Sequence, residues 1–207
     1  NIKIEAADGF GEIADSYALY FSDCDSLIVS NIDGSSPDAT RRGRGLFAED
    51  CETITLDNND FSLRFESIYL QDCADATVTD NDCTSSGSGA GDYALTFDNM
   101  SAIDHTAGVL GSGNTFGATT NGRYGVKFIN CSDIDIANTG ADFNIEDASG
   151  LNQIYDRALN LTTCTNFTIE NVDMSYTNGG VFGFGLELNN VHNLSVTNSN
   201  LSNRQRA

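Results

Sequence analysis

The sequence repeats one short phrase, in which a cysteine follows a polar residue and precedes alternating apolar residues. The phrase reads FSDCDSLIVSN at 21–31, AEDCETITLDN at 48–58, LQDCADATVTD at 70–80, FINCSDIDIAN at 128–138 and LTTCTNFTIEN at 161–171. With the cysteine as position 0, the equivalent residues are Cys24, Cys51, Cys73, Met100, Cys131, Cys164 and Val191, separated by 27, 22, 27, 31, 33 and 27 residues. Such a period is typical of a protein built from stacked structural units.

Apolar residues alternate with polar ones on both sides of position 0. Positions −5 and −3 hold Leu19 and Phe21, Leu46 and Ala48, Ile68 and Leu70, Leu95 and Phe97, Val126 and Phe128, Leu159 and Leu161, and Leu186 and Leu188. Positions +3 and +5 hold Leu27 and Val29, Ile54 and Leu56, Ala76 and Val78, Ile103 and His105, Ile134 and Ile136, Phe167 and Ile169, and Leu194 and Val196. This period of two predicts two short strands in each repeat, each with one buried face.

A third apolar position follows about ten residues after position 0, at Phe61, Cys83, Leu110, Met174 and Leu201. Short strands of this kind cannot bury their apolar faces singly, whereas stacked coils bury one continuous core. We therefore predict an all-β fold, a single-stranded parallel β-helix over residues 1–201, followed by a tail at 202–207. It would have about seven coils and a starting half-coil.

The cysteines at position 0 are interpreted as core residues. Cys, Met and Val interchange there, and a free cysteine behaves as a small buried apolar residue. Disulfides between neighbouring coils are the alternative, but the Cβ vectors of stacked residues run parallel instead of converging. Zinc is disfavoured because the sequence has no CxxC motif and no clustered His and Cys. We expect free thiols.

Asparagine and aspartate recur where the second strand ends, at Asn31, Asn58, Asp80, Asn138, Asn171 and Asn198. Stacked side chains of this kind satisfy backbone groups at a bend. With this turn ladder, the repeat resembles the right-handed parallel β-helix superfold of pectate lyases, polygalacturonases, phage tailspikes and bacterial surface proteins. The resemblance implies a right-handed helix and an extracellular or cell-surface location, but it does not imply one activity, because this superfold hosts many.

Repeat length varies between position +10 and the next first strand, so the longer segments are expected to project from one edge of the helix. Basic and aromatic residues occur there at Arg41, Arg42, Arg44, Arg64, Arg123, Arg157, Tyr93, Tyr124 and Tyr155. Such an edge could bind carboxylated sugars through bidentate contacts and ring stacking. The simpler alternative is that these arginines pair with Glu146, Asp147, Asp156 and Asp92 and order the loops.

The sequence lacks the catalytic motifs of the enzymes that it resembles. It has no Gly-His-Gly and no Arg-x-Lys motif, and no calcium-binding motif of the pectate lyases can be matched residue by residue. Of the two histidines, His105 falls on an inward position and His192 at a turn. These absences favour a non-catalytic protein.

The chain carries 30 acidic and 10 basic residues, a net charge of −20. This charge disfavours nucleic acid and anionic membranes as partners. The sequence has no run of 18 apolar residues that would predict membrane insertion.

Asp23, Asp50 and Asp72 precede position 0 in successive repeats. Carboxylates stacked at the strand spacing repel one another and gain from a bridging hard cation, so we expect weak calcium binding there and no required cofactor.

Two classes of function follow from these features. Apolar strand patterns run from Ile2 to Leu201, and no capping segment is recognised at either end. We therefore expect the partner to be either further coils of a longer β-helix or copies of the same chain stacked into a filament. The first class is a non-catalytic extracellular structural or adhesive protein. The second is a polysaccharide-binding or polysaccharide-cleaving module that uses the Arg and Tyr edge.

Overall fold

The protein is all-β in the part that the structure, a computed structural model, describes. The described residues are 2–5, 17–36, 43–84, 93–100, 124–137, 157–170, 174 and 183–202. The strands are β1 (Ile2–Glu5), β2 (Tyr17–Ser22), β3 (Leu27–Ser30), β4 (Arg44–Glu49), β5 (Thr53–Asp57), β6 (Ile68–Gln71), β7 (Asp75–Thr79), β8 (Tyr93–Asp98), β9 (Tyr124–Ile129), β10 (Ser132–Ala137), β11 (Arg157–Thr162), β12 (Thr165–Glu170), β13 (Phe184–Asn189) and β14 (His192–Thr197). Within these ranges, no helix is long and apolar enough to cross a membrane.

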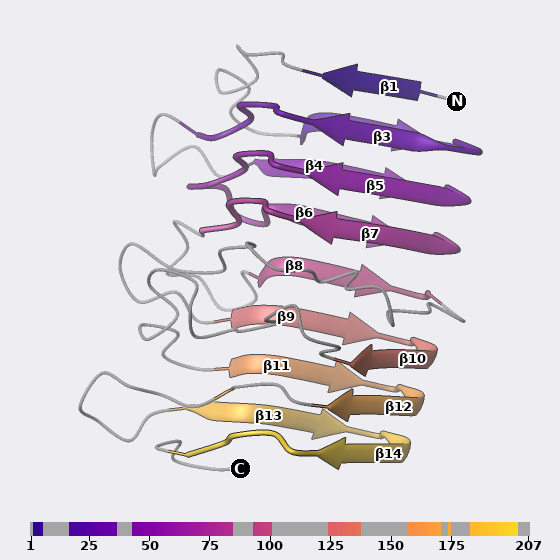
Figure 1. The fold of residues 1–207 in the computed structure, drawn as a ribbon, viewed down its shortest axis with the longest axis vertical. Helices are drawn as coiled ribbons and strands as arrows, with labels where there is room; N and C mark the ends of the chain where they lie inside the picture. The colour runs from indigo at the N-terminus through magenta and orange to yellow at the C-terminus, as the bar shows by residue number, and fades with distance from the viewer. Residues whose placement is uncertain are drawn as a thin grey trace.

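The strands form three parallel sheets. One sheet has seven strands in the order β13-β11-β9-β8-β6-β4-β2, and the other two have the orders β1-β3-β5-β7 and β10-β12-β14. The first strand of each repeat lies in the seven-stranded sheet, and the described second strands lie in the smaller sheets. The strands are therefore stacked in pairs from β1 at one end to β14 at the other, an arrangement consistent with a solenoid (Figure 1).

The strand register confirms the repeat alignment. Position −5 runs through the large sheet as Leu19, Leu46, Ile68, Leu95, Val126, Leu159 and Leu186, each paired with the next. Position +3 likewise pairs Leu27 with Ile54, Ile54 with Ala76, and Phe167 with Leu194. Most of these side chains are buried and belong to one hydrophobic core, which also holds Phe61, Cys83 and Met174 from position +10. His105 and Leu110 lie outside the described residues.

A turn with one left-handed residue follows the first strand of each repeat in the described part of the chain. At position −1, Asp23, Asp50, Asp72, Asn99, Asn130, Thr163 and Asn190 have φ between 52° and 55°. Asp and Asn tolerate this conformation better than most residues. The amide of each of the first six donates to the carbonyl of position −2 in the next repeat, as Asp23 N does to Glu49 O across 3.2 Å. The polar residue before each cysteine is thus a turn residue, as predicted.

All six cysteines are buried and free, in agreement with their interpretation as core residues. Position 0 is also filled by Met100, which is fully buried, and by the half-buried Val191. The side chains at this position therefore line the inside of the turn.

The register skips position −6 in the large sheet. Tyr17 pairs with Arg44 and Leu19 with Leu46, but the intervening residues do not pair. A Cβ on Gly45 would lie 2.4 Å from the carbonyl oxygen of Ser67 and 2.8 Å from Cβ of Phe61, a core residue. Position −6 therefore faces the core side and requires a small side chain, and it holds Ala18, Gly45, Ser67, Ala94, Gly125, Ala158 and Gly185. This interruption of the alternation brings positions −7 and −4 to the same outer face.

Candidate functional site on the outer face of the large sheet

Aromatic and charged side chains cover the outer face of the seven-stranded sheet. Position −4 contributes a row of residues that pair with one another from strand to strand. We use the name outer belt for Tyr17, Tyr20, Arg44, Phe47, Glu66, Tyr69, Tyr93, Thr96, Asp98, Lys127, Arg157, Asn160, Phe184 and Glu187. Their inward neighbours on the same strands form the core, so the outer belt lies on the opposite side of the sheet.

Arg44 is at the centre of the described contacts of the outer belt. Its guanidinium carbon lies 4.3 Å from the ring centroid of Tyr69 and 5.4 Å from that of Phe47. Its Nε donates to Oε2 of Glu66 across 2.7 Å. The planar guanidinium is suited to this combination of ring stacking and carboxylate pairing, and a lysine is not. The Arg44 side chain is 30% exposed, so a surface ligand could still reach it.

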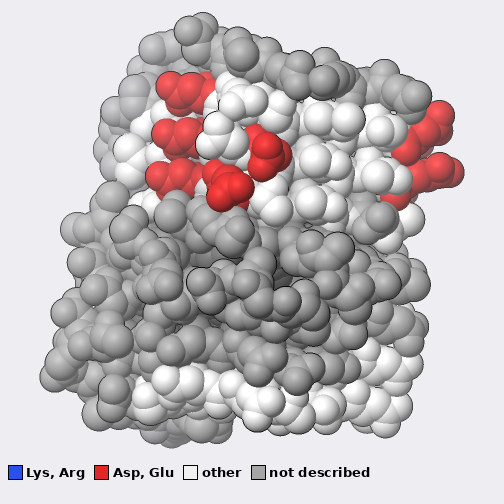
Figure 2. Space-filling view, in the orientation of Figure 1, with Lys and Arg blue, Asp and Glu red and all other residues white. Residues whose placement is uncertain are grey.

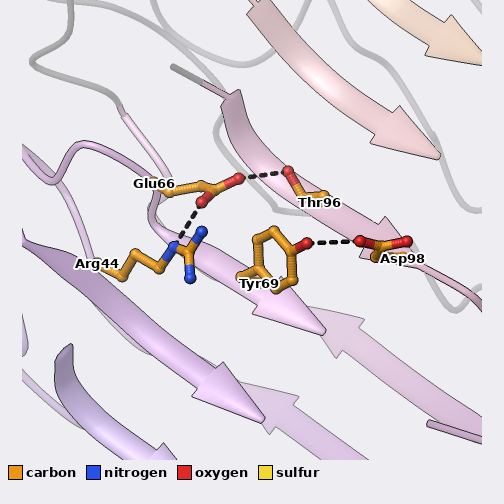
Figure 3. A network of polar contacts seen from close by, with 5 residues as sticks. All are labelled: Arg44, Glu66, Tyr69, Thr96 and Asp98. Carbon is orange, nitrogen blue, oxygen red and sulfur yellow. Dashed lines mark hydrogen bonds and ion pairs between the residues drawn. The ribbon is translucent and has the colours of Figure 1, made fainter. Parts of the chain in front are cut away.

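Glu66 is a buried carboxylate with two polar partners. Besides Arg44, it accepts a hydrogen bond from Oγ1 of Thr96 across 2.7 Å (Figure 3). Burial raises the pKa of Glu66, while the hydrogen bond from Thr96 and the charge of Arg44 oppose that increase. The residue lies between β4 and β8, so its two contacts join three successive repeats.

Tyr69 and Asp98 form a second polar contact beside the first. The Tyr69 hydroxyl donates to Oδ2 of Asp98 across 2.6 Å (Figure 3). Burial, together with this hydrogen bond, raises the pKa of Tyr69. Tyr69 therefore remains protonated and donates, so it is unsuited to act as a general base at neutral pH.

Aromatic rings are most accessible at the β2 end of the outer belt. Tyr17 stacks on Tyr20 and on Phe47, with ring centroids 5.5 Å and 5.1 Å apart. Tyr20 is 50% exposed, and its hydroxyl donates to Glu49. That hydrogen bond raises the pKa of Tyr20. An exposed ring with a carboxylate beside it is a surface on which a sugar ring can stack and donate a hydrogen bond.

The contacts differ toward β13. Lys127 Nζ lies 4.9 Å from the ring centroid of Tyr93. Further along, Arg157 forms an ion pair with Glu187, which also accepts a hydrogen bond from Asn160. Along the described outer belt, the two arginines each pair with a glutamate, so the surface is mixed in charge instead of basic.

The structure places the predicted ligand-binding residues in different surroundings. Arg44, Arg157 and Tyr93 lie on the outer belt, and Tyr124 begins β9. The partners of the two arginines are Glu66 and Glu187, whereas the partners expected from sequence, Glu146, Asp147, Asp156 and Asp92, lie outside the described residues. Arg41, Arg42, Arg123 and Tyr155 also lie outside them.

Arg64 needs a correction, because it is fully buried. Its Nε donates to the carbonyl oxygen of Gly34 across 2.8 Å, and burial lowers its pKa. The guanidinium satisfies backbone carbonyls of the neighbouring turn, and it cannot meet a ligand at the surface. We therefore exclude Arg64 from the ligand-binding set.

Asp23, Asp50 and Asp72 are exposed turn residues, as the expected calcium ladder requires. Asp72 accepts a hydrogen bond from Asn99, and Oδ2 of Asp23 accepts one from Ser22 across 2.9 Å. Among the described residues, no group of three or more His, Cys, Asp or Glu side chains is arranged to hold a metal ion. The ladder thus offers stacked carboxylates and no enclosed coordination site.

A second row of aspartates follows β3, β5 and β7. Asp33, Asp60 and Asp82 are joined by parallel bridges, and Oδ1 of each accepts the backbone amide two residues later. Figure 2 shows acidic side chains gathered over this part of the surface. Each carboxylate accepts a hydrogen bond from a backbone amide of its own turn, so the row has a structural role in stabilising these turns.

Sequence reasoning missed Glu66, Tyr69, Thr96, Asp98, Lys127 and Glu187 as members of this surface. The repeat alignment could have identified them, because most of them stand at the outward position −4 or next to it on the first strand, and strand pairing places these positions side by side. Comparison with protein-family models, with curated proteins and with solved structures finds no match for this chain. The geometry of the described residues is therefore the basis for a functional proposal.

Proposed function

We propose that the chain is a right-handed parallel β-helix that acts as a non-catalytic, extracellular structural or adhesive protein, and that its β13 and β14 edge is covered by a further coil, either the remainder of a longer β-helix or a second copy of the chain stacked end to end. The observation that carries this proposal is the surface of the last repeat. There, Leu188 and Val196 are 47% and 37% exposed, although they occupy the positions that are buried in earlier repeats. In the described part of the chain, β13 and β14 are edge strands of their sheets.

The hydrogen bonds between repeats define what would fit this edge. The amide of position −1 donates to the next repeat, as Thr163 N does to Asn189 O across 2.8 Å. The carbonyl of position 0 accepts a hydrogen bond from a backbone amide of the next repeat, as Cys164 O does from His192 N across 2.9 Å. In the last repeat, no described residue provides these partners for Asn190 N and Val191 O. Another coil with the same strand pattern would provide them and would cover the exposed leucine and valine.

Assembly is tested by analytical ultracentrifugation and electron microscopy over a range of protein concentrations. The expected result is a concentration-dependent series of linear oligomers. Leu188→Lys and Val196→Lys should abolish the series without lowering the melting temperature. Ser195→Lys is the matched control, because Ser195 is also exposed on β14 but lies between the inward positions Leu194 and Val196. A monomer at every concentration would contradict stacking.

The outer belt supports a second candidate, a polysaccharide-binding or polysaccharide-cleaving module. The supporting observation is the exposed Tyr20 ring stacked on Tyr17, next to the partly exposed Arg44. Neutral and acidic polysaccharides should be screened for binding and for new reducing ends or unsaturated products. Tyr20→Ala should weaken binding at least about tenfold if this surface is used, because stacking and hydrogen bonding to one ring are lost. Glu52→Ala, an exposed change away from the belt, is the control.

A further inference from the structure

Five of the six cysteines form two stacked groups inside the protein. Cys24, Cys51 and Cys73 follow one another in successive repeats, and Cys131 and Cys164 do the same. The cysteine carbonyls accept backbone amides from the next repeat: Glu52 N to Cys24 O at 2.9 Å, Ala74 N to Cys51 O at 3.0 Å, and Thr165 N to Cys131 O at 3.0 Å. These bonds hold successive cysteines in register.

The thiols in each group point the same way. Every one of these sulfurs contacts the carbonyl oxygen two residues before it, at 3.6 Å for Cys24, 3.3 Å for Cys51, 3.1 Å for Cys73, 3.2 Å for Cys131 and 3.4 Å for Cys164. A repeated contact on a repeated backbone means a repeated side-chain conformation. Neighbouring sulfurs are therefore stacked at about the strand spacing, roughly 4.8 Å.

This arrangement excludes two familiar outcomes. A disulfide needs an S–S distance of about 2.05 Å and converging Cβ atoms, whereas these side chains run parallel. A structural zinc site needs four ligands around one ion, and among the described residues no three or more His, Cys, Asp or Glu side chains are arranged around a common point. Two parallel thiolates can instead bind one ion from opposite sides. Two metal–sulfur bonds of about 2.3 Å, the length found in zinc thiolates, span about 4.6 Å, close to the strand spacing.

We propose that the stacked cysteines are binding sites for a soft, thiophilic divalent cation that takes linear two-coordinate ligation, with Hg(II) as its representative. One ion would bind between Cys131 and Cys164, and one within the group Cys24, Cys51 and Cys73. Three cysteines in a row provide one pair and one remaining thiol. The expected capacity is therefore two ions per chain.

The charge of the complex selects the divalent class. Each ion replaces the two thiol protons, so that Hg²⁺ and two R–SH give Hg(SR)₂ and two H⁺, and no oxidant or reductant is needed. The product is neutral. Cys131 is 1% exposed and Cys164 is fully buried, and a net charge there would be costly. A monovalent soft ion such as Cu(I) or Ag(I) between two thiolates would leave a buried negative charge, so we expect it to bind more weakly.

The test is a titration of the reduced full chain with HgCl₂, followed by native mass spectrometry, ultraviolet absorption of the mercury–thiolate bonds and proton release. The expected result is two ions and four protons per chain. Cys164→Ser should reduce the capacity to one ion. Cys83→Ser is the matched control, because Cys83 is also fully buried but lies outside position 0, and it should leave two ions bound.

Met100→Cys gives an independent test that does not remove a ligand. Met100 is fully buried at position 0 between the two groups, so this change would join them into one row of six thiols. The capacity should increase from two ions to three. A wild-type capacity of six ions, an equal loss in Cys83→Ser and Cys164→Ser, or an unchanged capacity in Met100→Cys would each overturn the proposal.

Discussion

The Nε atom of Arg44 lies 2.7 Å from Oε2 of Glu66, and this ion pair connects β4 to the segment that enters β6. Glu66 continues to Thr96 on β8, so one buried carboxylate links three consecutive repeats on the outer face of the sheet. The backbone hydrogen bond donated by the amide of position −1 recurs from repeat to repeat in the described part of the chain, whereas this side-chain link is particular to its place in the stack. It is therefore the part of the outer belt whose removal is most informative.

Glu66→Gln should change the pH dependence of stability. Burial raises the pKa of Glu66 in the folded protein above its ordinary value of 4.5, so the folded state binds this proton more tightly than the unfolded state. Its contribution to the free energy of unfolding is then fully present below about pH 4.5 and decreases as the pH rises through the folded-state pKa. Urea unfolding of both proteins from pH 4 to pH 8 measures this contribution as the difference between them. A difference independent of pH would contradict it.

Phe128→Ala should lower the free energy of unfolding by about 3–5 kcal/mol, because it removes a fully buried ring from the core. The ring stacks on Phe97 at 4.8 Å and meets Phe167 edge-on at 5.0 Å, so the cavity would be bounded by two other rings.

Leu70→Asp should abolish cooperative unfolding, since it buries an unpaired charge. Glu52→Ala, an exposed change, should stay within about 0.5 kcal/mol of wild type.

Thr163→Asn should stabilise the protein by about 1 kcal/mol. Thr163 has φ of 55°, which is costly for a β-branched residue, and the other six repeats have Asp or Asn at this position. Thermal unfolding of protein produced without glycosylation checks the effect. Asn130→Thr is the reverse control at the preceding repeat and should destabilise by a similar amount. Equal melting temperatures for Thr163→Asn and wild type would show that the turn carries no strain.

Ser67→Ala should be neutral or stabilising by up to about 1 kcal/mol. Ser67 is fully buried, and its hydroxyl oxygen has no hydrogen-bond partner. Removing an unsatisfied buried hydroxyl recovers its desolvation cost. Alanine already occupies the equivalent position at Ala18, Ala94 and Ala158, so the shape is acceptable. A loss of more than about 1 kcal/mol would indicate a partner for this hydroxyl.

Calcium should raise the melting temperature only modestly, at millimolar concentrations, through Asp23, Asp50 and Asp72. All three are exposed, so a bridging ion would relieve repulsion without being enclosed. Differential scanning calorimetry with calcium, with magnesium and with a chelator measures the effect. Asp50→Asn should remove it, because the central carboxylate is shared by both neighbours. An identical melting temperature in calcium and chelator would eliminate this ladder as a site.

The sequence predicted the inward positions well, because a period of two directly encodes which side chains are buried. Leu46, Ile54, Leu70 and Phe128 are all fully buried where the pattern places them. The interruption at position −6 was not recognised from the period of two, since small residues such as Gly45 do not mark which face of a strand they occupy, although a small residue recurs there in every repeat. Its consequence, that positions −7 and −4 share one face, is what assembles the outer belt.

Individual polar residues were harder to place than rows of apolar ones. Arg64 was expected on a surface loop because arginine is usually exposed, yet it is buried against backbone carbonyls. Asn59 and Asn81 form a buried pair in which Nδ2 of Asn59 donates to Oδ1 of Asn81 across 2.8 Å. These two asparagines differ in sequence from the exposed Asn58 and Asp80 only in lying one residue later. Whether an asparagine at such a turn is buried or exposed depends on whether its side chain points to the core or to solvent, and the sequence does not show this.

The uniform strand register has a consequence for how the protein folds and unfolds. In the described part of the chain, each strand pairs with a strand of at least one adjacent repeat, and the first strands form one continuous sheet, so each ordered repeat provides a template for the next. Order would then propagate along the chain as it does in a one-dimensional lattice, with the cost of initiation met once and later steps nearly equal. Amide hydrogen exchange should accordingly be slowest in the middle of the stack and faster toward β14. That strand pairs with one neighbouring strand only, so it can separate without breaking a second set of hydrogen bonds.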